Sequence, residues 1–262
     1  SVQDEEFLPF SSGTGLDLLP RRTADAKIQT LHFSLNATSN PLPKLTTTAK
    51  FRHYQTINDT PKTIFLAIVN DTGSQVDSSN TRALFNLPYD YIQDKFNFDV
   101  AYRIFPSTNF KMGYDFNLLK RDFRAVESTV ENTFKATLRS HYFSWANANA
   151  NFSYGERDGE NYDTSRVFES RHTPEFVTPG SFDAVPDLRR YDIADRSRLK
   201  IGTNLHISAS SKLDFGISYN FLEDDYDESV LGLRNNQNQT VAVDANYSLG
   251  ENGALFAYYT HE

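Results

Sequence analysis

Residues 95–118, KFNFDVAYRIFPSTNFKMGYDFNL, decide the fold because apolar and polar residues alternate along them one by one. A period of two is the signature of a β-strand, whose successive side chains point to opposite faces. The alternation covers 95–104, stops at the turn-forming Pro106-Ser107-Thr108-Asn109, and resumes over 110–118. This stretch therefore predicts a long antiparallel hairpin that has one apolar face and one polar face.

Four further segments repeat this plan, which predicts one repeated architecture rather than several domains. Each segment joins two alternating runs through a short turn, so that about ten strands are expected in total. The paired runs are 27–36 with 44–54, 133–139 with 147–154, 199–207 with 213–221, and 241–249 with 254–260.

The connections between hairpins are polar and mostly long, and we expect the long ones at about 55–93, 155–195 and 222–239. An outer-membrane barrel sorts its connections in this way, with tight periplasmic turns and long extracellular loops, whereas a soluble sandwich has no reason to. Strands of about 10 to 12 residues, tilted by about 40°, rise roughly 25 to 30 Å, which is a hydrocarbon thickness. The sequence therefore predicts an all-β fold, an antiparallel up-and-down transmembrane β-barrel. It forms a single complete or partial barrel domain over residues 1–262 in the bacterial outer membrane.

The composition excludes several functions. Lys and Arg number 26 against 34 Asp and Glu, and the net charge of −8 repels phosphate, so no nucleic-acid partner is expected. The absence of Cys excludes disulfides, thiolate metal sites and covalent CxxCH haem attachment in this chain.

The longest apolar run, residues 64–69, is far shorter than the roughly 20 residues of a spanning helix. The chain opens without Met or a signal segment, which predicts a mature, processed or shortened chain.

The apolar faces of the predicted strands are expected to contact membrane lipid. Aromatic residues near strand ends, namely Tyr54, Tyr91, Trp145, Tyr154, Tyr219 and Tyr247, are expected to form interfacial girdles. The lipid-facing candidates are Phe96, Phe98, Val100, Tyr102, Ile104, Phe110, Met112, Tyr114, Phe116, Ile201, Leu205, Phe215, Ile217, Tyr219, Val241, Val243 and Tyr247.

The polar faces are expected to line a lumen. Both signs of charge occur there, and the wall has two interpretations: it only stays hydrated, or it contacts a permeant solute or an inserted protein. The lumen-facing candidates are Lys95, Asn97, Asp99, Arg103, Lys111, Asp115, Asn117, Lys135, Arg139, Lys200, Asn204, His206, Asp214, Asn220, Asp244 and Asn246.

No motif in the chain predicts catalysis or a metal site. The six His residues are scattered, and neither HExxH nor the GxSxG elbow of hydrolases occurs. The acidic run 223–228 suggests Ca²⁺, but an EF-hand that begins at Asp225 would place Val230 where Gly is required. We therefore expect a solvated loop there, no catalytic residue, no metal ligand and no enzyme.

Six strings in the chain carry a family resemblance when they are taken together and in order. They resemble the MtrB/PioB family of decahaem-associated outer-membrane barrels, from about residue 41 to the last residue. The strings are NLPYDY at 86–91, FRAVE at 123–127, ERDG at 156–159, RRYDIADRSR at 189–198, DDYDESVLGL at 224–233 and AYYTHE at 257–262.

This resemblance implies that the barrel is a sheath around a periplasmic multihaem c-type cytochrome, through which electrons cross the outer membrane. A hydrocarbon layer of about 30 Å admits no soluble redox protein, so a lipid-excluding channel is needed. The haem would belong to the cytochrome, with no cofactor bound by this chain, and a surface cytochrome is the second partner implied. Family barrels have well over twenty strands and an aromatic C-terminal residue. Ten strands that end in His261-Glu262 therefore predict a piece of a larger barrel.

Three other functions fit parts of the pattern. A general diffusion porin or substrate-specific channel would share the strands, the girdles and the mixed-charge wall. An outer-membrane hydrolase would need a Ser, His and Asn constellation that spacing cannot reveal. A soluble β-sandwich adhesin would be soluble without detergent.

Overall fold

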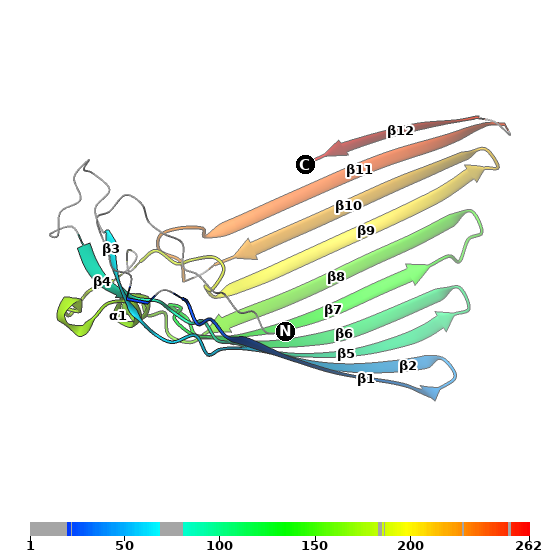
Figure 1. Ribbon diagram of the computed structural model, residues 1–262. Coiled ribbons are helices and arrows are strands. Elements are labelled where there is room, and N and C mark those ends of the chain that lie inside the picture. The colour runs from blue at the N-terminus through cyan, green and yellow to red at the C-terminus, as the bar shows by residue number, and fades with distance from the viewer. Residues whose placement is uncertain are drawn as a thin grey trace.

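The computed structural model describes residues 20–21, 23–68, 81–182, 185, 187–226, 228–250 and 253–262. Ten strands form one antiparallel sheet in the order β1-β2-β5-β6-β7-β8-β9-β10-β11-β12, so each strand pairs with its neighbours along the sheet (Figure 1). The predicted all-β, up-and-down architecture is therefore confirmed. The strands are β1 (Ile28–Leu42), β2 (Leu45–Asn58), β5 (Tyr91–Phe105), β6 (Thr108–Arg121), β7 (Ser128–Ser140), β8 (Ala146–Gly159), β9 (Arg196–Ser210), β10 (Leu213–Asp225), β11 (Asn235–Gly250) and β12 (Gly253–His261).

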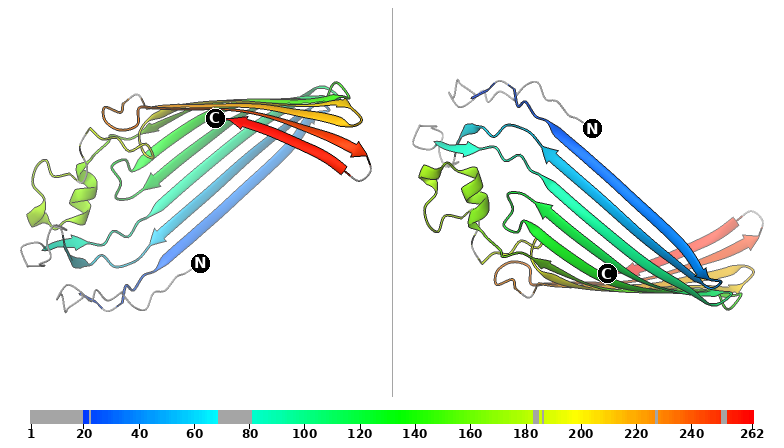
Figure 2. Two further views of the ribbon diagram at one scale, coloured as in Figure 1. Left: turned by 90° about the horizontal axis from the view of Figure 1, so that it is seen from above. Right: turned by 90° about the horizontal axis from the view of Figure 1, so that it is seen from below.

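The sheet is open, because β1 and β12 lie at its two edges and do not pair with each other. It curves into a trough along which the strands run obliquely (Figures 1 and 2). The short turns gather at one end of this trough and the long connections at the other. In the β5–β6 hairpin the ladder runs from Tyr91↔Arg121 to Phe105↔Thr108, which leaves only Pro106 and Ser107 as the turn.

The strands extend further toward the long connections than the alternation predicts. The expected loops 55–93, 155–195 and 222–239 shorten to 59–90, 160–195 and 226–234. Their ends belong to strands because backbone pairing continues, as in Thr56↔Tyr91, after the apolar residues of one face have given way to polar ones. The hydropathy pattern therefore shows only the apolar band, whereas the backbone hydrogen bonds show the full strand, which extends beyond that band.

The long connections carry small elements of their own at the loop end of the trough (Figure 1). β3 (Ile64–Ile68) and β4 (Thr81–Phe85) form a separate two-stranded sheet between β2 and β5. The apolar run 64–69 supplies β3, and its residue 69 lies outside the described residues. The connection from β8 to β9 contains α1 (Ser165–Arg171) and the 3₁₀ turn η2 (Pro174–Phe176). No helix in the described ranges is long and apolar enough to span a bilayer.

Few side chains are buried anywhere in the described part of the chain. The buried apolar residues there are mainly loop-end residues such as Val126 and Ile193, which are 2% and 1% exposed. By contrast, strand residues such as Met112 and Phe134 are 58% and 60% exposed. Because so much contiguous apolar surface is unfavourable in water, the sheet needs an apolar environment on that face.

Candidate functional site

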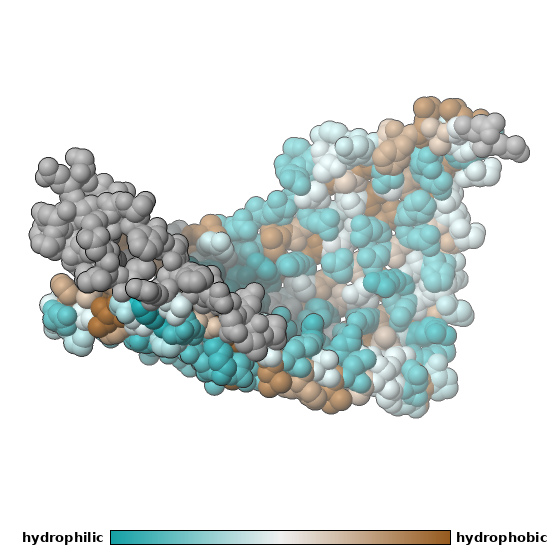
Figure 3. Space-filling model, viewed as in Figure 1, coloured by the Kyte–Doolittle hydropathy of each residue, from teal (hydrophilic) through white to brown (hydrophobic). Residues whose placement is uncertain are grey.

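The hydrogen-bonded register separates the predicted side chains onto two faces of the sheet. In the β5–β6 pair Phe96 lies opposite Phe116, whereas the adjacent Lys95 lies opposite Asn117. The same parity holds across the sheet: every lumen-facing candidate lies on one face and every lipid-facing candidate on the other. Figure 3 looks onto the hollowed face, where hydrophilic side chains predominate over the middle strands. This concave face is the candidate functional site, and its contact with water or a guest protein stays a prediction.

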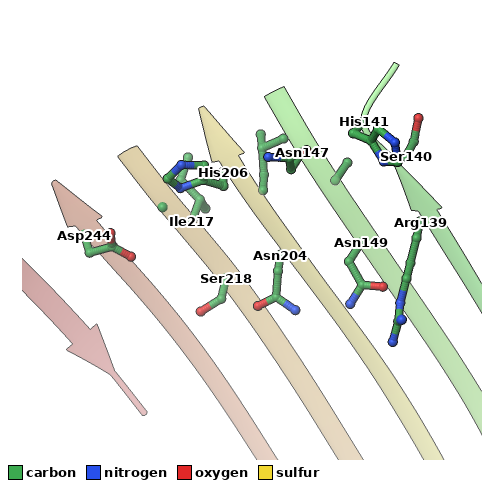
Figure 4. A pocket seen from close by; sticks show the side chains of 13 residues that line it. Arg139, Ser140, His141, Asn147, Asn149, Asn204, His206, Ile217, Ser218 and Asp244 are labelled. Atoms are coloured by element: carbon green, nitrogen blue, oxygen red, sulfur yellow. The ribbon is translucent and has the colours of Figure 1, made fainter. Parts of the chain in front are cut away.

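The side chains of the concave face form rows that cross the strands at one level. Ser218, Asn204, Asn149 and Arg139 are successive partners on β10, β9, β8 and β7. Figure 4 shows these four side chains near one another on the same face, in a hollow of about 490 Å³ that also includes His206. Amide and hydroxyl groups both donate and accept hydrogen bonds, so such a row suits water or a polar protein surface equally.

Ion pairs link neighbouring strands across the concave face. The Lys111 ammonium lies 3.0 Å from the Asp99 carboxylate, and Lys135 lies 2.6 Å from Asp115. Asn97 donates a further hydrogen bond to Asp115 at 2.6 Å. Gly113 makes room for the first of these pairs, because a Cβ added there would lie only 2.4 Å from an Asp99 oxygen. These acidic side chains are therefore engaged by basic groups of the same wall.

The concave face has an excess of basic groups although the whole chain has a net charge of −8. By register, its strands carry twelve Lys and Arg against six Asp and Glu. Sequence analysis missed this excess because it did not weigh the two charge signs on this face against each other. The basic residues are Lys50, Arg52, Lys95, Arg103, Lys111, Arg121, Lys135, Arg139, Arg157, Arg196, Arg198 and Lys200, and the acidic residues are Asp99, Asp115, Glu131, Asp214, Asp224 and Asp244.

The opposite, convex face carries an apolar band that ends before the strands do. On β5 the band runs from Ile104 to Phe96, and the next residue on that face toward the loops is Asp94, whose carboxylate lies 2.6 Å from the His53 imidazole. A polar contact of this kind marks the level at which the surface becomes polar. The girdle prediction was wrong for Tyr54 and Tyr91, because the register places both on the concave face beside Gln93. The alternation had not been continued far enough along β2 and β5 to show this.

Neither a metal-binding cluster nor a hydrogen-bonded Ser–His pair is found among the residues that the structure describes. Within those ranges no group of three His, Asp or Glu residues could hold a metal ion. No described serine hydroxyl is hydrogen-bonded to a histidine, as a hydrolytic triad would require. The acidic run 223–228 is not a free solvated loop either, because its first three residues belong to β10.

Asp224 instead belongs to a buried ionic cluster at the loop end of the concave face, formed by Glu131, Arg196, Arg198 and Asp224. The Arg198 guanidinium makes two hydrogen bonds to the Asp224 carboxylate, of 2.5 and 2.8 Å. Arg196 lies 2.6 Å from Glu131 and 3.8 Å from Asp224. The side chains of Asp224 and Arg196 are only 3% and 8% exposed, whereas those of Glu131 and Arg198 are 25% and 30% exposed, so the cluster ties β7, β9 and β10 together around two buried charges.

A second set of contacts docks the segment 190–195 onto the end of β8. The Arg157 guanidinium donates to the carbonyl oxygens of Ala194 and Tyr191 at 2.6 and 2.7 Å. The Asp195 carboxylate accepts a 2.6 Å hydrogen bond from the Gly159 backbone N–H. The end of β8 can approach this segment and Val126 closely because residue 159 is glycine. A Cβ at this position would lie only 2.8 Å from a Val126 methyl carbon. The segment therefore covers the loop end of the sheet in a fixed position.

Apolar contacts and a third ion pair complete this docking. Val126, from the β6–β7 connection, and Ile193 pack together with Ala125. Arg124 pairs with Asp192, which joins the same two connections. Four of the six strings that carry the family resemblance therefore meet at the loop end: 123–127, 156–159, 189–198 and 224–233. Sequence analysis could not predict this convergence, because the strings lie up to about one hundred residues apart.

Two loop carboxylates near this region have shifted pKa values. Burial, and then the nearby carboxylates of Asp90 and Glu127, raise the pKa of Asp122. The Ser165 hydroxyl, and then its backbone N–H, hydrogen-bond the Asp163 carboxylate and hold its pKa below the usual range. Asp122 thus weakens the folded loop end when it is ionised, while Asp163 stabilises the start of α1 when it is ionised.

An up-and-down antiparallel sheet with an apolar convex face and a polar concave face is typical of the wall of an outer-membrane β-barrel protein. Residues 1–262 match the MtrB/PioB family, described as outer membrane beta-barrel porins, and the chain belongs to that family. The chain is 26% identical over 262 residues to "Outer membrane protein MtrB" of Shewanella baltica (strain OS185). The match covers 99% of this chain and 34% of that relative, so the chain spans about a third of the relative's length.

Proposed function

We propose that this chain forms part of the wall of a barrel that holds a periplasmic multihaem c-type cytochrome and so supports electron transfer across the outer membrane. The observation that carries the proposal is the open, polar, hydrogen-bonding concave face of a sheet that belongs to the MtrB/PioB family. The family supports a structural or channel role, and we infer that the chain itself does not catalyse a reaction. The long connections would face the cell exterior and the short turns the periplasm, as in other outer-membrane barrels.

The width of the sheet favours a guest of protein size. Ten strands about 4.8 Å apart and tilted by about 40° span an arc of roughly 60 Å. If the ten strands closed alone, the barrel radius would be about 10 Å, which side chains largely fill. The chain spans about a third of its relative, so a whole barrel would have about three arcs of that width. Three such arcs would close at a radius of about 30 Å, which admits a folded domain of about 100 residues with a radius of gyration near 13 Å.

The chain does not supply the redox centre under this proposal. Covalent c-type haem attachment needs Cys, and the sequence has none. Haem would therefore arrive with the cytochrome, and the residues of the concave face would position that protein and exclude lipid around it. Membrane lipid would contact the convex face, and a surface cytochrome would contact the loop end.

The experiment is purification of the intact protein from native outer membranes in mild detergent. We expect haem absorbance to co-purify with the barrel. We also expect reconstituted vesicles to pass electrons from an external reductant to a trapped dye without passing small sugars. A matched preparation from cells that cannot attach haem to cytochromes should lose the electron transfer and keep the barrel.

A diffusion porin is the second candidate function. The uncharged part of the row that ends at Arg139, namely Ser218, Asn204 and Asn149, favours it, since uncharged polar side chains also suit a water-filled pore. A porin would purify without haem and would let sugars through in the same vesicles. That pair of results would contradict the sheath and support the porin.

A further inference from the structure

A recess of about 280 Å³ lies on the concave face over β1, β2 and β5. Its two cations, Arg52 and Lys95, are direct cross-strand partners, a position in which the two Cβ atoms are about 5 Å apart. Two tyrosine rings, Tyr54 and Tyr91, meet edge to face beside them with centroids 5.5 Å apart. The recess is lined by His32, Arg52, Tyr54, Tyr91, Gln93 and Lys95.

The two cations of the recess have no acidic partner on the described part of the wall, a lack they share with several other basic residues of this face, but only these two lie directly opposite each other without one. Lys111, Lys135 and Arg198 each have a carboxylate of the same wall within 3.0 Å. Among the described residues, by contrast, no Asp or Glu forms an ion pair with Arg52 or Lys95. Like charges placed directly opposite each other destabilise a sheet, so the isolated barrel wall carries an unfavourable contact here.

Other groups of the recess are arranged to receive an anion. Tyr91 donates its hydroxyl hydrogen to Gln93 at 3.0 Å, which fixes the side chain of Gln93. The Tyr54 hydroxyl oxygen accepts from Thr56 at 3.3 Å, so its own O–H can donate to a ligand. Guanidinium, ammonium and phenol groups together match the oxygens of a carboxylate. A volume of 280 Å³ suits one or two carboxylate side chains rather than a whole domain.

We propose that this recess receives carboxylate groups of the protein enclosed by the barrel, and that the guest surface beside β1, β2 and β5 is therefore acidic. This inference rests on the proposed function, because it needs a guest protein in the lumen. The guest's charge would replace the missing wall partner and relieve the repulsion between Arg52 and Lys95. The recess lies level with Phe51 and Phe96, which end the apolar band, so it would hold the guest near the loop end of the barrel.

The first test is a zero-length carbodiimide cross-link in the native detergent-solubilised complex, read by mass spectrometry. An amide should join the Lys95 amine to a carboxylate of the haem-containing guest, with loss of one water. The linked group identifies the source, either an acidic side chain or a haem propionate. Lys135 provides the internal control, because its nearest carboxylate is Asp115 of the same wall. Loss of the Lys95 product in 50 mM inorganic phosphate, with the guest still bound, would show a free-anion site and overturn the proposal.

The second test compares variants by the amount of haem that stays bound through a salt wash. The double variant Arg52→Gln/Lys95→Gln should retain haem at least about tenfold less well, as expected for loss of close charge pairs. Its unfolding midpoint without guest should be unchanged or higher, because the repulsion has been removed. Lys62→Gln/Lys120→Gln, which makes the same charge change outside this recess, should retain haem normally.

The outcomes separate this inference from the proposed function. Absence of haem from the wild-type preparation would contradict the sheath itself. Haem retained equally by wild type and the Arg52/Lys95 variant, with no Lys95 cross-link to the guest, would leave the sheath standing and overturn the carboxylate recess.

Discussion

The buried ionic cluster at the loop end yields a quantitative prediction through Asp224. Replacing Asp224 by Asn keeps the side-chain volume but removes the charge that faces Arg198 and Arg196. Removing one partner of a buried ion pair typically costs about 3 to 5 kcal/mol, because the other charge is left uncompensated out of water. Arg196 is 8% exposed and cannot be rehydrated easily, whereas Arg198 is 30% exposed and can. We therefore expect a loss of about 3 kcal/mol, at the low end of that range.

The assay is guanidinium unfolding of the intact protein in lipid vesicles, followed by circular dichroism. Asp225→Asn is the matched control, because the adjacent Asp225 lies on the other face of β10 and forms no ion pair among the described residues. Its effect should stay within about 0.5 kcal/mol. In a double-mutant cycle, Asp224→Asn and Arg198→Gln should be clearly non-additive. If Asp224→Asn and Asp225→Asn proved equally mild, the cluster would not hold the loop end together.

The remaining predictions concern the two faces and the loop carboxylates. Val100→Arg should destabilise the barrel by about 2 to 4 kcal/mol in vesicles, because it puts a charge in lipid. The adjacent Ala101→Arg, on the concave face, should cost far less. Equal costs for the two variants would refute the assignment of the two faces. Gly113→Val should displace Asp99 and lower the thermal midpoint measured by heat-modifiable gel migration. Folding raises the pKa of Asp122 above its ordinary value of 3.8. The free energy of unfolding should therefore increase as the pH falls from above the raised pKa to 3.8, because the folded protein binds the proton more tightly. Asp122→Asn should flatten this pH dependence in unfolding titrations.

The strands and their two faces could be predicted from the sequence because each is a local property. Alternation in 95–104 assigns Lys95 and Phe96 to opposite faces before any partner strand is known. Five short turns then fix antiparallel pairing, which brings like faces together. Only the strand ends were misjudged, at Tyr54 and Tyr91, because the last few residues of a strand outside the apolar band carry no hydropathy signal.

The contacts at the loop end, both the ionic cluster and the docking of segment 190–195, could not be predicted because they join segments that are distant in the sequence. Arg124 and Asp192 lie 68 residues apart, and neither position is marked by periodicity. The acidic run at 223–228 was interpreted as a solvated loop, since composition alone does not distinguish a hydrated carboxylate from one that faces Arg198. The family strings marked these places without explaining them, and the explanation lies in Val126, Ile193 and the buried charges.

The positions of the unpaired basic side chains on the concave face say more about function than their number does. A closed barrel wall that only needs hydration can satisfy its cations with its own carboxylates, as Lys111 and Lys135 do. At the loop end, beyond the apolar band, Arg196 and Arg198 are likewise neutralised by the wall itself. Arg52 and Lys95 face each other instead, with hydrogen-bonding tyrosines around them, although the chain has an excess of acidic residues that could have been placed there. A surface that leaves this repulsion uncorrected is stabilised when a second molecule supplies the negative charge, so the proposed guest would stabilise the wall at this recess.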